Sequence, residues 1–154
     1  MVEKIRNKMK EAKGFTLVEL IVVLVILAIL AAMLVPALTG YIDKANKEKV
    51  TAECRQVVMA AQTEASSLYG KANGGAITLT DTEKAQLAAD IAKLSETKGK
   101  FIATITTGGT VSSVIYQNAG WQVTYTAANT NPYDDPVQVT GSVSALAGNT
   151  VALS

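Results

Sequence analysis

The feature that most constrains this chain is an uninterrupted apolar segment near its N-terminus. The 23 residues from Leu20 to Ile42 include no charged side chain. At about 1.5 Å per residue, an α-helix of this length crosses a bilayer core of about 30 Å. The segment is too long for the apolar region of a cleaved secretory signal, and no small-residue cleavage site follows it. The sequence therefore predicts a membrane-spanning hydrophobic helix, which we place at residues 15–42.

A single carboxylate, Glu19, lies immediately before the apolar run. A carboxylate at the edge of the hydrocarbon costs about 2–3 kcal/mol, and such residues usually have a partner and a purpose. An ordinary membrane anchor explains the length of the segment but does not explain this residue. Glu19 is therefore a candidate functional residue.

The charge distribution changes at the same place. Residues 1–14 carry five basic and two acidic side chains, while residues 15–154 carry nine basic and eleven acidic ones, so loss of the first 14 residues changes the net charge from +1 to −2. The short basic tail favours a cytoplasmic N-terminus, with the long C-terminal part outside. Residues 101–154 contain neither Lys nor Arg, so the C-terminal half offers no basic patch for nucleic acid.

The junction between tail and apolar run carries a specific combination of residues. Residues 13–19 read K-G-F-T-L-V-E, and the apolar run with Pro36 follows. Over about residues 10 to 45 the chain resembles a type IV prepilin. The resemblance implies that residues 1–14 are a leader, which a membrane aspartyl prepilin peptidase removes by cutting between Gly14 and Phe15. It also implies N-methylation of the new Phe15 amine.

The same resemblance implies a life cycle and a set of partners. The prepilin is inserted in the cytoplasmic membrane, and an assembly platform then builds it, with minor pilins, into a helical homopolymer at the cell surface. Thr16 and Glu19 act in assembly. Pro36 removes a backbone hydrogen bond and predicts a kink; with Gly40 it marks a segment that unwinds when subunits pack. The single cysteine, Cys54, allows no intrachain disulfide, which fits pilins of Gram-positive bacteria better than many Gram-negative ones.

The helix is expected to continue beyond the membrane, over residues 43–69. Apolar residues recur there every three or four positions, which is the period of one helix face: Val50, Cys54, Val57, Ala61, Ala65 and Leu68. A second, short helix is predicted at residues 81–98. Thr80 and Glu83 have the spacing of a capping box at its start, and Lys98-Gly99 is expected to end it.

From Phe101 onward the apolar period changes to two, which indicates strands. Turn signals at Gly108-Gly109 and at residues 118–120 separate strands at 101–107, 110–117 and from Trp121 onward, with a shorter strand at 137–143. The expected fold class is α+β: a long N-terminal helix packed on a sheet of three or four antiparallel strands at 101–143, with a short extra helix. Residues 43–154 then form one globular pilin domain.

Catalytic groups are scarce in this sequence. It has no histidine, a single thiol, no glycine-rich phosphate loop after a strand and no Cys/His metal cluster, so we expect neither an enzyme nor a cofactor. A membrane-anchored enzyme domain is accordingly disfavoured. The adjacent carboxylates of Asp134 and Asp135 leave a Ca²⁺ site open, although a solvated turn is the simpler interpretation. The expected function is the major pilin of a type IV pilus, with a pseudopilin of a type II secretion or competence system as the alternative.

Overall fold

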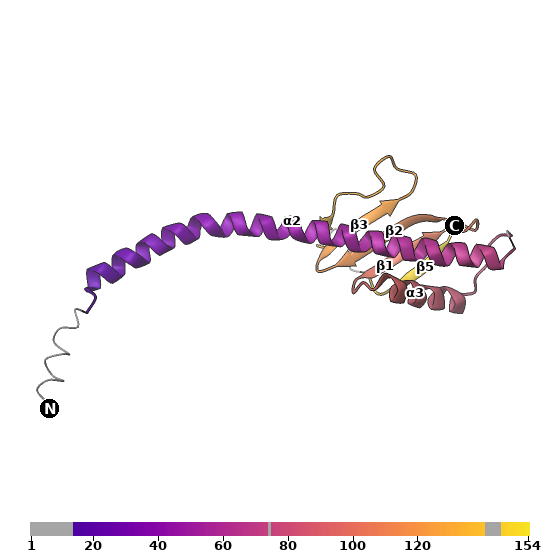
Figure 1. Ribbon diagram of the computed structural model, residues 1–154, viewed down its shortest axis with the longest axis horizontal. Helices are drawn as coiled ribbons and strands as arrows, with labels where there is room; N and C mark the ends of the chain where they lie inside the picture. Colours follow the sequence, from indigo (N-terminus) through magenta and orange to yellow (C-terminus); the bar gives the residue numbers. More distant parts are fainter. Residues whose placement is uncertain (1–13, 74, 141–145) are drawn as a thin grey trace, which may run out of the picture. The chain divides into compact units, whose positions relative to one another are not determined.

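The computed structural model describes residues 14–73, 75–140 and 146–154, whose elements are shown in Figure 1. Two helices of the described residues precede the strands. In chain order the elements are α2 (Leu17–Lys71), α3 (Asp81–Ser95), β1 (Lys100–Ile105), β2 (Val111–Asn118), β3 (Trp121–Thr126), β4 (Val137–Gln138) and β5 (Thr150–Leu153). The chain divides into two compact units, one up to Ile42 and one from Asp43 to Ser154. The expected α+β class, a long helix on a sheet with a short extra helix, is confirmed.

The part of α2 that follows residue 42 packs on the sheet through the face that the apolar period predicts. Five of the six residues of that face are buried, and the sixth, Leu68, is half-buried against the same core. Gln62 adds a polar connection to the β1–β2 turn. Its Nε2 donates to the carbonyl of Gly109 at 2.9 Å, and its Oε1 accepts from the N–H of Val111 at 3.0 Å. This part of α2 is thus held against the sheet by an apolar stripe and by the Gln62 side chain, which hydrogen-bonds the backbone of the turn.

Within the described part of the chain, the sheet has five strands in the order β4-β3-β2-β1-β5, and all pairs are antiparallel except β1 with β5. The prediction of three or four antiparallel strands ending at residue 143 is wrong in two respects. The last strand, Thr150–Leu153, pairs in parallel with β1 at the sheet edge. The strand predicted at 137–143 is formed only at Val137–Gln138, and its last three residues lie outside the described part of the chain. Parallel pairing of a four-residue strand depends on distant contacts, which local periodicity does not report.

The short helix α3 begins as predicted but ends earlier. The capping box is present, with the N–H of Glu83 donating to Thr80 Oγ1 at 3.4 Å and the N–H of Thr80 donating to Glu83 Oε2 at 2.8 Å. The helix ends at Ser95 and not at Lys98, because Glu96 adopts the left-handed conformation with φ of 52° and stops the helical hydrogen bonding. Gly99 serves a different purpose: a Cβ there would collide with the Tyr116 ring and the backbone of β2.

The core of the second unit lies between α2, α3 and one face of the sheet. Phe101, Tyr116 and Val123 occupy paired positions on three neighbouring strands, and all three are buried. The phenol of Tyr116 is satisfied at this depth, because it donates to Glu53 Oε2 at 3.0 Å and accepts from the N–H of Gly99 at 3.1 Å. Glu53 thereby joins α2 to β2 by a charge-assisted hydrogen bond.

Two buried acids of this core make the fold sensitive to alkaline pH. Burial raises the pKa of the Cys54 thiol from 9.0 to about 12 and that of the Tyr116 phenol from 10.0 to about 12. An unfolded chain therefore loses both protons at lower pH than the folded chain does. The contribution of these two groups to the free energy of unfolding should be fully present below about pH 9 and should be lost as the pH rises from 9 to 12. Urea denaturation of the detergent-solubilised protein measures this trend. Tyr116→Phe should flatten this dependence above pH 10, whereas the exposed control Tyr69→Phe should not. An unchanged slope in Tyr116→Phe would contradict the assignment.

Candidate functional site

The predicted processing site lies in non-helical backbone just before α2. Gly14, Phe15 and Thr16 are exposed and belong to no helix or strand, and α2 begins at Leu17. The peptide bond between Gly14 and Phe15 is therefore accessible and is not involved in a helical turn. A Cβ at Gly14 would meet no atom of the described residues within 4 Å, so packing against those residues does not require the glycine. The remainder of the predicted leader, residues 1–13, lies outside the described part.

Thr16 and Glu19 form a reciprocal pair of hydrogen bonds at the start of α2. The N–H of Glu19 donates to Thr16 Oγ1 at 3.2 Å, and the N–H of Thr16 donates to Glu19 Oε2 at 3.5 Å, the longer and weaker of the two. This is the arrangement of a capping box, in which a side chain at each position satisfies a backbone donor of the other. The carboxylate also lies in the first turn, where the helix dipole favours negative charge.

The resemblance of the sequence to prepilins implies that Glu19 and Thr16 act in assembly, but it does not predict this local contact. The signal was present, since T-L-V-E at 16–19 has the same spacing as T-D-T-E at 80–83, where the capping box was predicted. The capping leaves one carboxylate oxygen, Glu19 Oε1, without a hydrogen bond among the described residues. Glu19 is exposed, so this oxygen is open to a cation from outside the chain.

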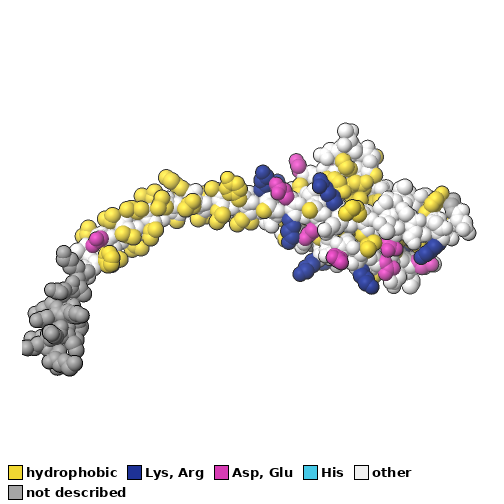
Figure 2. Space-filling model, in the orientation of Figure 1, with side chains coloured by type: hydrophobic (Ala, Val, Ile, Leu, Met, Phe, Trp, Pro, Cys, Tyr) yellow, Lys and Arg dark blue, Asp and Glu magenta, His cyan; other side chains and the backbone are white. Residues whose placement is uncertain are grey.

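The apolar segment that follows presents its side chains outward. Every large apolar side chain from Phe15 to Ile42 is exposed, from 48% for Val23 to 78% for Phe15. Figure 2 shows hydrophobic side chains along this segment, whereas the Lys, Arg, Asp and Glu side chains drawn there gather mainly on the second unit. By length and composition α2 is able to cross a membrane, and none of its most apolar window is buried. A surface of this kind requires lipid or other protein around it.

Pro36 and Gly40 lie inside α2, which is assigned as helix through both positions. Proline has no N–H to donate to the preceding turn. Three residues on, Thr39 Oγ1 donates to the carbonyl of Pro36 at 2.9 Å. This side-chain bond gives that carbonyl a hydroxyl donor one turn further along the helix. Kinking or unwinding at these two residues stays a prediction.

The two carboxylates considered for Ca²⁺ lie in different surroundings from those a calcium site needs. Asp134 and Asp135 are exposed, and the backbone N–H of Asp134 donates to the carbonyl of Thr124 at 2.9 Å. Asp135 lines a hollow together with the cations of Lys44, Lys47 and Arg55. Within residues 14–73, 75–140 and 146–154, no three His, Cys, Asp or Glu residues are grouped so that they could hold a metal. Basic neighbours disfavour a divalent cation, which prefers six to eight oxygens.

The N-terminal segment matches a known protein family. Residues 9–35 match the family model of the prokaryotic N-terminal methylation motif. The match contains the Gly14–Phe15 junction, the Thr16–Glu19 box and the exposed apolar helix as far as Val35. No solved structure matches the chain at a significant level. The matched motif, together with the long apolar helix, supports a type IV pilin-like or pseudopilin-like prepilin, a structural and not an enzymatic class of protein.

Proposed function

We propose that this chain is the major pilin of a type IV pilus in a Gram-positive bacterium. The observation that carries the proposal is the methylation motif at residues 9–35 placed on an accessible junction and an outward-facing apolar helix. Cleavage after Gly14 removes the basic leader, and the remaining chain then begins at the methylated Phe15. The subunit is inserted in the cytoplasmic membrane until it is assembled into a surface fibre, which is used for adhesion, motility or biofilm formation.

The apolar helix suits both environments for the same physical reason. Side chains from Leu20 to Ile42 are as well accommodated by lipid tails as by the same side chains of neighbouring subunits. Transfer from membrane to fibre core therefore needs little exchange of apolar surface with water. Because such packing is non-directional, polar groups have to set the position of one helix against the next. Glu19 is the only charged side chain from Phe15 to Ile42 and is our candidate for this function.

Processing is the most direct test of the proposed class. Purified fibres should contain subunits whose first residue is Phe15, heavier by one methyl group, as measured by N-terminal sequencing and intact mass. A bulky residue in place of Gly14 should block the cut, because the peptidase cleft has to admit the backbone closely; we suggest Gly14→Val. Ala37→Val is a matched control that leaves the junction unchanged. Subunits that begin at Met1, or that begin after Ala37, would contradict the assignment.

Pseudopilins of type II secretion or competence systems share the N-terminal motif, so the kind of assembly distinguishes the two roles. A major pilin forms long surface fibres in which this chain is the most abundant protein. Electron microscopy of cells, combined with mass spectrometry of sheared fibres, measures both properties. Processed subunits that remain in the membrane fraction without surface fibres would favour the pseudopilin.

A further inference from the structure

Few large apolar side chains are exposed in the second unit. Among its described residues these are Met59, Tyr69, Leu94 and Val137. Met59 and Leu94 line one groove, and Val137 lies in the edge strand β4. Exposed apolar side chains beside grooves commonly mark contact surfaces.

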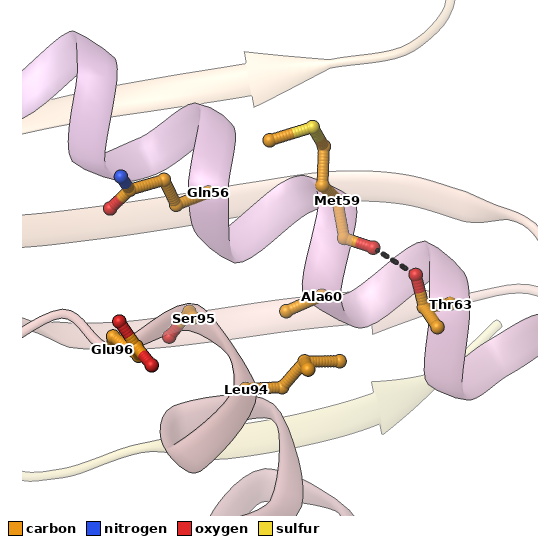
Figure 3. A pocket seen from close by; sticks show the side chains of 7 residues that line it. All are labelled: Gln56, Met59, Ala60, Thr63, Leu94, Ser95 and Glu96. Carbon is orange, nitrogen blue, oxygen red and sulfur yellow. Dashed lines mark hydrogen bonds between the residues drawn. The ribbon is translucent and has the colours of Figure 1, made fainter.

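The first surface, which we call the α2–α3 groove, lies between the two helices. One hollow of about 390 Å³ is lined by Met59, Ala60 and Thr63 of α2 and by Leu94, Ser95 and Glu96 at the end of α3, together with Gln56. Figure 3 shows Leu94 extending from α3 toward Ala60 of α2. A second hollow shares Leu94 and Glu96 with the first, and a third shares Glu64 and Asp90 with the second, so the groove extends along both helices. An apolar side chain of moderate size therefore has room in this groove.

Acidic side chains dominate the rim of the α2–α3 groove. Four carboxylates and two lysines line the three hollows: Glu64, Glu83, Asp90, Glu96, Lys71 and Lys93. The groove therefore carries a net negative charge. It favours a partner whose apolar side chain is accompanied by cations.

The second surface, which we call the Val137 edge, has the opposite character. Val137 is 47% exposed and follows Pro136, which lines a hollow of about 410 Å³ with Lys44, Lys47 and Arg55. Glu48 and Asp135 line the same hollow, so cations exceed carboxylates there by three to two. Aromatic rings hold two of these cations in place. Lys47 Nζ lies 5.3 Å from the ring centre of Trp121, and Arg55 Cζ lies 5.1 Å from that of Tyr133.

The two surfaces lie at opposite ends of the sheet order. β4 forms one edge of the sheet, while β5 forms the other and packs against α3. A surface and its complement at opposite edges cannot close a two-fold dimer through one contact. Instead, one surface of each subunit meets the other surface of the next subunit, which is a heterologous contact that can repeat along a chain of subunits. This is the kind of contact that a helical homopolymer requires.

We propose that the Val137 edge of one subunit inserts into the α2–α3 groove of the next, with Val137 against Leu94 and the cations around Lys44 facing the carboxylates around Asp90. The inference rests on the proposed function, because it supposes a fibre of this chain. The occupant of the groove is then a second copy of this chain. The contact joins the globular domains and is separate from packing of the apolar helices.

Cross-linking in assembled fibres tests this contact. The full chain carrying Val137→Cys and Leu94→Cys should assemble, and mild oxidation should give a ladder of dimers, trimers and longer covalent products. Each single substitution should stay monomeric, because the native Cys54 is fully buried. A disulfide needs the two Cα atoms within about 7 Å, so a ladder reports direct contact. The matched control pairs Val137→Cys with Ala85→Cys, an exposed α3 residue that does not line the groove, and should give no ladder.

The outcomes separate the inference from the proposed function. Normal fibres without a ladder, or with dimers only, overturn the head-to-tail contact and leave the pilin assignment intact. A wild-type chain that forms no fibres overturns the assignment itself.

Charge reversal provides a second measurement that remains decisive if the cysteine pair does not assemble. Asp90→Lys and Lys44→Glu should each lower the fibre yield severalfold, and the two together should restore it. Lys98→Glu, which lines neither surface, should have no effect. A double variant no better than the worse single one overturns the contact.

Discussion

Glu19→Ala is expected to leave cleavage and membrane insertion intact while surface fibres disappear or become rare. The proposed cleavage would create a positive amine at Phe15, four residues before this carboxylate. An isolated charge of either sign is costly where water scarcely reaches. In the proposed fibre, pairing the amine of an incoming subunit with Glu19 of a neighbour would offset both costs and would fix the axial position of the two helices. Loss of one partner leaves the other unpaired, at a cost of about 3–5 kcal/mol.

The capping box gives Glu19 a second, local role, and two substitutions separate the role in capping from the role of the charge. Glutamine can accept the Thr16 N–H as glutamate does, so Glu19→Gln preserves the cap and removes only the charge. Thr16→Val removes the hydroxyl that accepts from the N–H of Glu19 and keeps the charge. We expect Glu19→Gln to fail in assembly nearly as completely as Glu19→Ala, and Thr16→Val to have the smaller effect that loss of a cap implies, about 0.5–2 kcal/mol.

Fibre counts by electron microscopy, normalised to processed subunit in the membrane, measure these effects. Normal fibre numbers in Glu19→Gln cells would show that capping, and not charge, is what assembly requires of this residue. Normal numbers in Glu19→Ala cells would show that the residue is not needed to position the helices at all.

Much of this architecture could be predicted because its signals are local. The stripe from Val50 to Leu68 repeats with the period of a helix, and the structure buries it. The Gly108-Gly109 and 118–120 turns separate the predicted strands, and Ala119 and Gly120 have the positive φ values of 50° and 79° that a two-residue hairpin needs. Each of these features is determined within a few residues, which is the range over which sequence patterns are informative.

The features that were missed depend on contacts between distant segments or on a competing interpretation. The strand β5 lies about 45 residues after its partner β1 in the chain and carries only one buried side chain, Val151. The box at Thr16–Glu19 was overlooked because the carboxylate was interpreted only as a partner for another chain. The end of α3 was predicted at residue 98 on the signal of Lys98-Gly99, whereas that glycine is needed for the close approach of Tyr116.

Removal of β5 is expected to destabilise the second unit strongly, although only a few residues are lost. In a chain ending at Asn149, β1 would lose its parallel partner, including the bond from the N–H of Ser154 to the carbonyl of Ile105 at 3.0 Å. Burial of Val151 contributes about 1.5–3 kcal/mol, and each strand hydrogen bond about 1 kcal/mol. Against a typical total of about 5–15 kcal/mol, the loss should lower the melting temperature by roughly 10–20 °C. Circular dichroism of the detergent-solubilised protein measures it.

Two point substitutions separate side-chain burial from strand pairing. Val151→Ala keeps the backbone of β5 and removes buried methyl groups, so it should cost about 1–2 kcal/mol, less than the deletion. Ala152→Ser lies on the exposed side of the same strand and should change stability by no more than about 0.5 kcal/mol. The truncated chain should also aggregate more readily, because β1 becomes an unprotected edge. If the truncated chain melts at the temperature of the full chain, β5 does not contribute to the sheet in solution, and β1 is then already an edge strand that other chains can approach.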